Sequence, residues 1–114
     1  MRGRTLAGGL ATLALATGTA IPALASGGGH GAAVHSVVLK NIRFHPGTLS
    51  ITRGDTVSWL WEDRGTEHNV TGSGFKSKTM TKGSFSVRFT KAGTFNYRCT
   101  IHAAEGMKGK IVVH

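Results

Sequence analysis

The sequence predicts an all-β domain, a small antiparallel Greek-key β-sandwich, between residues 34 and 114. Apolar and polar residues alternate in several short segments, and this period places one set of side chains on one face of a sheet. Gly, Pro, Asp and Ser cluster between these segments, as is typical of turns. No stretch of this region has the periodicity of an amphipathic helix. Short strands at such spacing are typical of antiparallel sandwiches and barrels.

Six segments show the strand pattern, and in chain order they are 34–39, 48–52, 57–61, 85–89, 95–99 and 111–113. Turn sequences separate them at 45–47, 53–55, 72–74, 82–83 and 92–93. The aromatic residues in these segments are the expected core, namely Trp59, Trp61, Phe85, Phe89, Phe95 and Tyr97.

The N-terminus has the features of a secretory signal peptide. Arg2 and Arg4 precede an uncharged stretch from Leu6 to Ile21, and Ala23-Leu24-Ala25 fits the pattern that signal peptidases cut. We expect cleavage near Ala25/Ser26, which removes residues 1–25. Residues 26–33 would then form a flexible Gly-rich leader, followed by one exported domain at 34–114, in the periplasm, at the cell surface or outside the cell. The alternative is a retained membrane anchor, although the apolar stretch is short for a span.

Cys99 is the one cysteine of the chain, so an internal disulfide is excluded. Small exported domains usually need a disulfide or a metal to support a modest core. A lone thiol in an oxidising compartment is vulnerable unless it is buried or bound. Metal ligation is one reason to retain such a residue.

The chain is strongly basic, with a formal charge of +9. Without Arg2 and Arg4, twelve basic side chains remain against five acidic ones, a charge of about +7. This charge could steer the domain towards an acidic docking face on a partner protein or towards an anionic membrane surface; simple solubility is the alternative. Nucleic acid is not an expected partner because no recognition element is present. We expect a monomer.

A Cys-x2-His-x4-Met motif begins at the last residue of the segment 95–99 and consists of Cys99, His102 and Met107. One short loop between two strands can therefore present a thiolate, an imidazole and a thioether together. His68, which follows the segment 57–61, is the natural fourth ligand. Two imidazoles, a thiolate and a weak thioether form a type 1, or blue, copper site. Such a site suits both Cu(I) and Cu(II) and hence one-electron transfer, with zinc as the competing metal.

These motifs resemble the cupredoxins of the plastocyanin/pseudoazurin group. The resemblance covers most of the chain after the signal peptide, in the segments 44–46, 54–59, 68–70, 92–99 and 106–113. It implies a cupredoxin-like sandwich that holds one copper ion and carries single electrons to and from a redox partner protein.

The resemblance also implies roles beside the ligands. Asn69 would tie the two ligand loops together, with its backbone N–H directed at the cysteine sulfur. The ring of His102 would reach the surface at its edge, and Ala103, Ala104 and Gly106 would surround it as a small apolar docking patch.

The main alternative function is copper binding or delivery outside the cytoplasm, and a non-redox sandwich with an incidental thiol is another. The chain is not expected to be an enzyme. Multicopper oxidases and nitrite reductases need His-x-His pairs and a histidine beside the cysteine, whereas Cys99 is flanked by Arg98 and Thr100. None of the five acidic residues has an evident catalytic partner.

Ile101 stands where relatives with this spacing usually have proline, so this position retains a backbone N–H. We predict that this N–H can donate to the Cys99 sulfur, withdraw charge from it and favour Cu(I). Ile101→Pro should then lower the reduction potential, as measured by redox titration. An unchanged or raised potential would eliminate this role for Ile101.

Overall fold

The structure, a computed structural model, describes residues 32–114. The expected signal peptide and residues 26–31 of the expected leader lie outside the described residues. Within the described range the chain forms strands and one turn of 3-10 helix, with no α-helix. No helix in this range has the length and apolarity needed to cross a bilayer.

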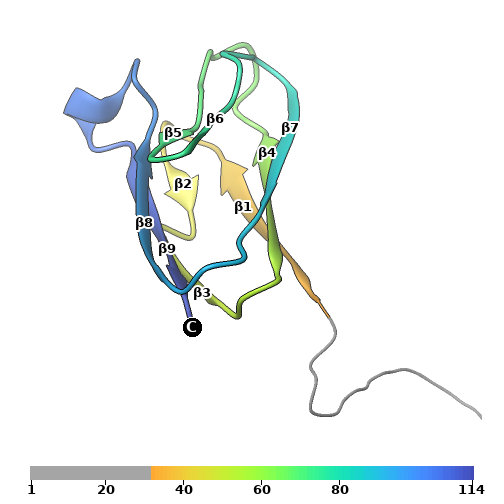
Figure 1. Ribbon diagram of the computed structural model, residues 1–114. Helices are drawn as coiled ribbons and strands as arrows, with labels where there is room; N and C mark the ends of the chain where they lie inside the picture. The colour runs from red at the N-terminus through yellow and green to blue at the C-terminus, as the bar shows by residue number, and fades with distance from the viewer. Residues whose placement is uncertain (1–31) are drawn as a thin grey trace, which may run out of the picture. The chain divides into compact units, whose positions relative to one another are not determined.

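The strands form the two layers of a sandwich (Figure 1). In chain order they are β1 (Val34–Leu39), β2 (Phe44–His45), β3 (Thr48–Ile51), β4 (Thr56–Trp61), β5 (Thr71–Gly72), β6 (Phe75–Lys76), β7 (Gly83–Arg88), β8 (Gly93–Arg98) and β9 (Lys108–Val113), with the 3-10 turn η2 (Ala103–Glu105) before β9. One sheet has the order β2-β1-β4-β7 and the other β3-β9-β8-β5-β6. The expected all-β sandwich is therefore confirmed.

Both sheets are mixed, whereas the sequence suggested purely antiparallel pairing. β1 lies parallel to β4, and β3 lies parallel to β9. The reason is the path of the chain, which leaves the first sheet after β2, adds β3 to the second sheet and then returns as β4. Strands on either side of such a crossover can run in the same direction.

The six expected strand segments all occur, with ends shifted by up to three residues. The strands β2, β5 and β6 were not expected. Each has two residues, which is too short to show an alternating pattern.

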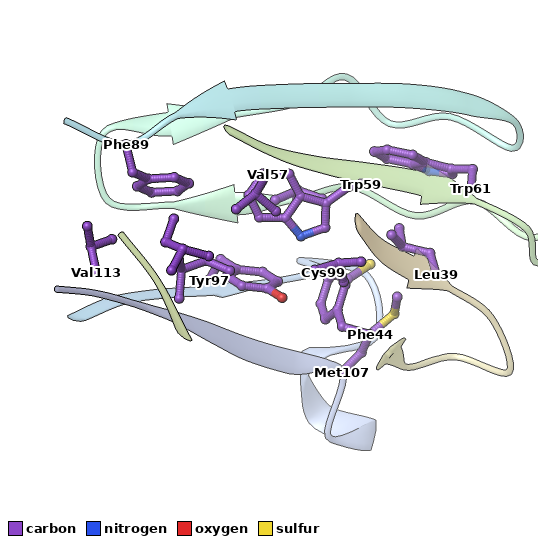
Figure 2. Packing of buried hydrophobic residues seen from close by; sticks show 14 residues of the cluster. Leu39, Phe44, Val57, Trp59, Trp61, Phe89, Tyr97, Cys99, Met107 and Val113 are labelled. Atoms are coloured by element: carbon purple, nitrogen blue, oxygen red, sulfur yellow. The ribbon is translucent and has the colours of Figure 1, made fainter. Parts of the chain in front are cut away.

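Trp59 is the centre of the core and is fully buried (Figure 2). Its ring packs against Phe75 and Tyr97, with centroid distances of 5.7 and 5.3 Å. Of the six expected core aromatics, Phe85 and Phe95 are partly buried and the other four are buried. Burial raises the pKa of Tyr97 to about 12, so its hydroxyl stays neutral inside the core.

Asp55 fixes the start of β1 at one end of the sandwich. Its carboxylate accepts hydrogen bonds from the N–H groups of Ala33 and Thr52, at 3.0 and 3.1 Å, and contacts His35 at 2.8 Å. Ala33 lies at the end of the expected leader, and its carbonyl also accepts the N–H of Thr56. Ala33 is therefore attached to the sandwich.

The turn between β1 and β2 is strained. Asn41 and Ile42 both have positive φ, 55° and 56°. On either side of them, the N–H of Lys40 donates to the carbonyl of Arg43 and the N–H of Arg43 donates to the carbonyl of Lys40. Positive φ at both central residues is typical of hairpin turns with the sequence Asn-Gly. A β-branched residue in this conformation costs about 1–3 kcal/mol. Ile42 offsets part of this cost because its side chain packs against the core.

The sandwich brings two loops to one end. β4 ends at Trp61 and leads to His68, while β8 ends at Arg98 and leads to Cys99. The loop after β8 projects beyond the sheets together with η2 (Figure 1). The expected ligands therefore belong to neighbouring loops.

We predict that Gly109→Ala destabilises the fold. Gly109 pairs with Tyr97 across β8 and β9, and a Cβ there would lie 2.5 Å from both Cζ and Oη of Tyr97. Forcing these groups apart should cost about 1–3 kcal/mol in the free energy of unfolding, measured by urea denaturation of the metal-free protein.

Gly47→Ala is the matched control because a Cβ at Gly47 meets no atom within 4 Å. It should change the stability by less than about 0.5 kcal/mol. Equal effects of the two substitutions would contradict the close approach of Tyr97 to Gly109.

Candidate metal centre

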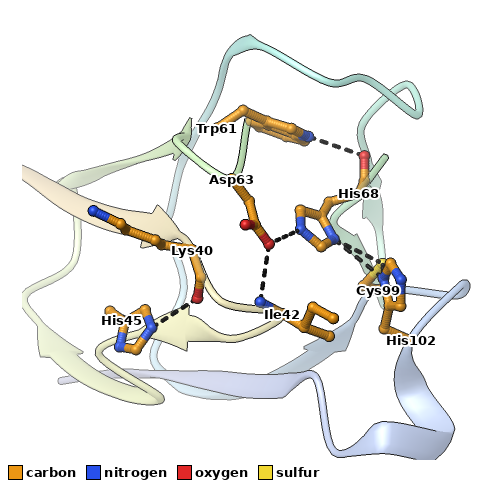
Figure 3. Close-up of polar contacts among 8 residues, drawn as sticks. All are labelled: Lys40, Ile42, His45, Trp61, Asp63, His68, Cys99 and His102. Carbon is orange, nitrogen blue, oxygen red and sulfur yellow. Dashed lines mark hydrogen bonds and ion pairs between the residues drawn. The ribbon is translucent and has the colours of Figure 1, made fainter. Parts of the chain in front are cut away.

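The backbone of His68 is fixed on both sides. Its N–H donates to the carbonyl of Met80 and its carbonyl accepts the N–H of Met80, both at 2.9 Å. The indole N–H of Trp61 donates to the same His68 carbonyl at 3.0 Å (Figure 3). His68 is fully buried, so these bonds set the position from which its ring extends towards the second loop.

The second loop folds back on itself through its backbone. The N–H of Cys99 donates to the carbonyl of Met107 at 3.1 Å, and the N–H of Met107 donates to the carbonyl of His102 at 3.2 Å. Between them, η2 ends at Glu105 and is capped by Gly106, whose φ of 90° favours glycine. These bonds hold all three residues of the Cys-x2-His-x4-Met motif in one compact loop.

The side chains of His68, Cys99 and His102 meet at one point (Figure 3). The Nδ1 atoms of the two histidines are 3.2 Å apart, and the Cys99 sulfur lies 3.8 Å from Nδ1 of His68 and 3.6 Å from Nδ1 of His102. Among residues 32–114, this is the one cluster of three His, Cys, Asp or Glu side chains that could hold a metal ion.

The distances between these three atoms leave room for one metal ion bonded to all of them. The point in the plane of the three atoms that is equidistant from them lies about 2.1 Å from each, and metal bonds to nitrogen and sulfur are about 2.0–2.3 Å long. An ion at this point would have three donors in one plane. The observed geometry therefore fits a metal with two imidazoles and a thiolate in a trigonal arrangement.

Met107 is fully buried. Figure 2 shows its sulfur at the same end of the core as the sulfur of Cys99. Its backbone bonds to Cys99 and His102 place it beside the other two residues of the motif.

Asn69 connects the two loops with its side-chain amide. Its Oδ1 accepts the N–H of Thr100 at 3.0 Å and its Nδ2 donates to the Thr100 hydroxyl at 2.8 Å. Further bonds join the amide to Thr71 and Thr79. The amide is buried with its hydrogen-bonding groups engaged, so it holds the loops at a fixed separation.

Among the described residues, the Cys99 sulfur contacts Nδ1 of both imidazoles. Donation to this sulfur from the backbone N–H groups of Asn69 and Ile101 stays a prediction. The effect of Ile101 on the reduction potential stays a prediction.

Asp63 contacts the site, although the sequence offered no partner for it. Its Oδ2 lies 2.8 Å from Nε2 of His68 and accepts the N–H of Ile42 at 2.9 Å (Figure 3). The hydrogen bond with His68, followed by the one from Ile42, holds the pKa of Asp63 below its ordinary value of 3.8. The signal for Asp63 in the sequence was its position in the same loop as the candidate ligand His68.

His102 is the one expected ligand that is not fully buried. His68, Cys99 and Met107 are fully buried, whereas His102 is half-buried. Ile101, Ala104 and Gly106 are exposed around it, and the exposed fraction of Ile101 is 48%. The ring of His102 thus lies between the buried donors and a small apolar surface.

Comparisons with known proteins agree with this geometry. The family model for copper-binding proteins of the plastocyanin/azurin family matches residues 32–114. Plastocyanin of Scenedesmus fuscus is 32% identical over 84 residues, which cover 61% of this chain and 85% of that protein.

Amicyanin of Paracoccus denitrificans is 33% identical over 85 residues, which cover 68% of this chain and 63% of amicyanin. The match thus spans a little under two thirds of amicyanin's own length. A solved structure of an oxidised amicyanin variant superposes with a TM-score of 0.62 at 32% identity, covering 70% of this chain and 81% of that one.

Proposed function

We propose that this chain, which belongs to the plastocyanin/azurin family of copper-binding proteins, is an exported one-electron carrier with one type 1 copper ion. The ligands would be His68, Cys99, His102 and Met107. The observation that supports this most directly is the trigonal arrangement of three donor atoms around a point about 2.1 Å from each.

The donor set suits copper in both oxidation states. Thiolate and thioether favour Cu(I), imidazole accepts either state, and the bound ion would supply the Cu(I)/Cu(II) couple. The protein contributes rigidity, because Asn69 and the backbone bonds of the Cys99 loop fix the donors. A fixed donor set changes little between oxidation states and therefore permits fast electron transfer.

Electrons would enter and leave through His102. It is the one half-buried residue of the proposed ligand set, and the exposed Ile101 and Ala104 flank it. A small apolar patch of this kind suits the brief contacts that a carrier makes with its partners.

Membership of this family agrees with the expectation that the chain is not an enzyme. The His-x-His pairs on which copper oxidases depend are absent from the sequence. A carrier needs one redox centre and a surface for a partner, and the domain has candidates for both.

Export is supported by the N-terminal pattern of Arg2 and Arg4, the apolar stretch and Ala23-Leu24-Ala25. Cleavage near Ala25 would release the domain with its short leader. We propose that the released protein acts as a monomer outside the cytoplasm.

The partner is proposed to carry an acidic docking face. Arg98 and Lys108 pair across β8 and β9, and Thr71 lies in register with both Arg98 and Lys76. These three exposed cations form a row on the outer face of the sheet, beside the Cys99 loop. Like charges directly opposite each other are unfavourable in a sheet, and attraction of an anionic partner gives a reason to retain them.

Copper delivery is the competing function. A delivery protein needs an open site that releases copper quickly, whereas three of the four proposed ligands are fully buried here. Burial and the loop cross-link by Asn69 therefore favour electron transfer.

We predict that the copper-loaded protein has an intense absorption band at about 600 nm from thiolate-to-Cu(II) charge transfer. The band should vanish on reduction, return on oxidation, and be absent from Cys99→Ser at equal copper content. Visible spectroscopy with metal analysis measures both properties.

Metal analysis also separates copper from zinc, which the same donors can bind without colour. A weak spectrum in a fully copper-loaded wild-type protein would favour delivery or incidental binding. A band of equal strength in Cys99→Ser would rule out this ligand set.

We predict that Arg98→Glu/Lys108→Glu slows oxidation of the Cu(I) protein by hexacyanoferrate(III), an anionic oxidant, by about tenfold or more at low ionic strength. Stopped-flow spectroscopy measures the rate. Arg53→Glu/Lys91→Glu makes the same charge change at the other end of the sandwich, since Arg53 bonds to His114 and Lys91 precedes β8. Equal slowing by the two pairs would contradict steering by the cationic row.

A further inference from the structure

Asp63 is placed to control one ligand of the proposed copper site. Its Oδ2 lies 2.8 Å from Nε2 of His68, on the side of the ring opposite the donor atom Nδ1. His68 is fully buried and the Asp63 side chain is 18% exposed. The imidazole is thus enclosed between a carboxylate and the metal-binding point (Figure 3).

The contact determines which nitrogen of His68 carries the proton. An ionised carboxylate can only accept a hydrogen bond, so Nε2 must be the donor. In a neutral imidazole Nδ1 then has a free lone pair, which a metal ligand needs. This lone pair is directed at the point that Cys99 and His102 share.

Asp63 is itself fixed by the turn between β1 and β2. The N–H of Ile42 donates to the same Oδ2 atom at 2.9 Å, from a residue whose φ of 56° is unfavourable for isoleucine. A strained backbone conformation persists only when contacts with the surrounding structure hold the residue in it. Here the strained residue directs its N–H at the carboxylate and packs its side chain against the core.

We propose that Asp63 is a positioning residue that holds His68 in the tautomer with Nδ1 free for the metal and places a negative charge beside the copper. This inference rests on the proposed function for its effect on copper. The tautomer itself can be measured without metal.

Two substitutions separate the two effects. Asp63→Asn removes the charge, and its amide oxygen can still accept the N–H groups of His68 and Ile42. Asp63→Ala removes both the charge and the acceptor. Glu62→Gln is the matched control for charge, because Glu62 is the neighbouring exposed carboxylate and no side-chain contact joins it to His68 among the described residues.

Nitrogen-15 NMR of the metal-free protein reports the tautomer of His68. We expect the Nε2–H form in the wild type and in Asp63→Asn, and a mixture of tautomers in Asp63→Ala. Copper affinity, measured by competition with a chelator, should fall about 10- to 100-fold in Asp63→Ala.

The reduction potential reports the charge. It should rise in Asp63→Asn, because losing a nearby negative charge destabilises Cu(II) relative to Cu(I), and it should rise far less in Glu62→Gln. Equal shifts in these two variants, or an unchanged tautomer and copper affinity in Asp63→Ala, would overturn the proposal. Failure of the proposed function would differ, because the wild type would lack the charge-transfer band whatever the tautomer of His68.

Discussion

Two imidazole nitrogens and one cysteine sulfur lie at metal-bonding distance from a common point. The packing of the sheets and the contacts between the loops keep these three atoms together. These atoms come from two loops, and the candidate ligands His68 and Cys99 are 31 positions apart in sequence. A β-sandwich can hold such loops together because the ends of β4 and β8 lie at the same end of two packed sheets. The Asn69 amide then joins the loops directly, through two hydrogen bonds to Thr100. Packing of the two sheets brings the loops to the same end of the sandwich. The Asn69 amide then holds the His68 loop against the Cys99 loop.

Burying such a set of polar groups is unfavourable unless each finds a partner. The structure meets this requirement at His68 through Met80, Trp61 and Asp63. The metal is expected to satisfy the remaining donor atom. The strained Ile42 belongs to the same network, since its N–H stabilises the carboxylate that contacts His68. The strained turn at Ile42 is thus linked through Asp63 to the candidate ligand His68 by hydrogen bonds.

Much of this arrangement could be predicted from the sequence because it depends on local spacing. Alternation in Val57, Trp59 and Trp61 located β4, and the Cys-x2-His-x4-Met spacing brought Cys99, His102 and Met107 into one loop. Features that depend on tertiary structure could not be found this way. The direction of Asp63 is set by an irregular loop without periodicity, and the positive φ of Ile42 opposes the intrinsic preference of isoleucine. The parallel pairs β1–β4 and β3–β9 follow from the crossover between sheets, which strand patterns do not encode.

The central claim is that one metal ion bonds to the Cys99 sulfur and to one nitrogen of each of His68 and His102. X-ray absorption spectroscopy at the copper edge measures these bonds directly in the loaded protein. We predict one sulfur and two nitrogen neighbours at about 2.0–2.3 Å, with the short sulfur neighbour lost in Cys99→Ser. A shell of nitrogen and oxygen atoms alone in the wild-type protein would contradict the assignment.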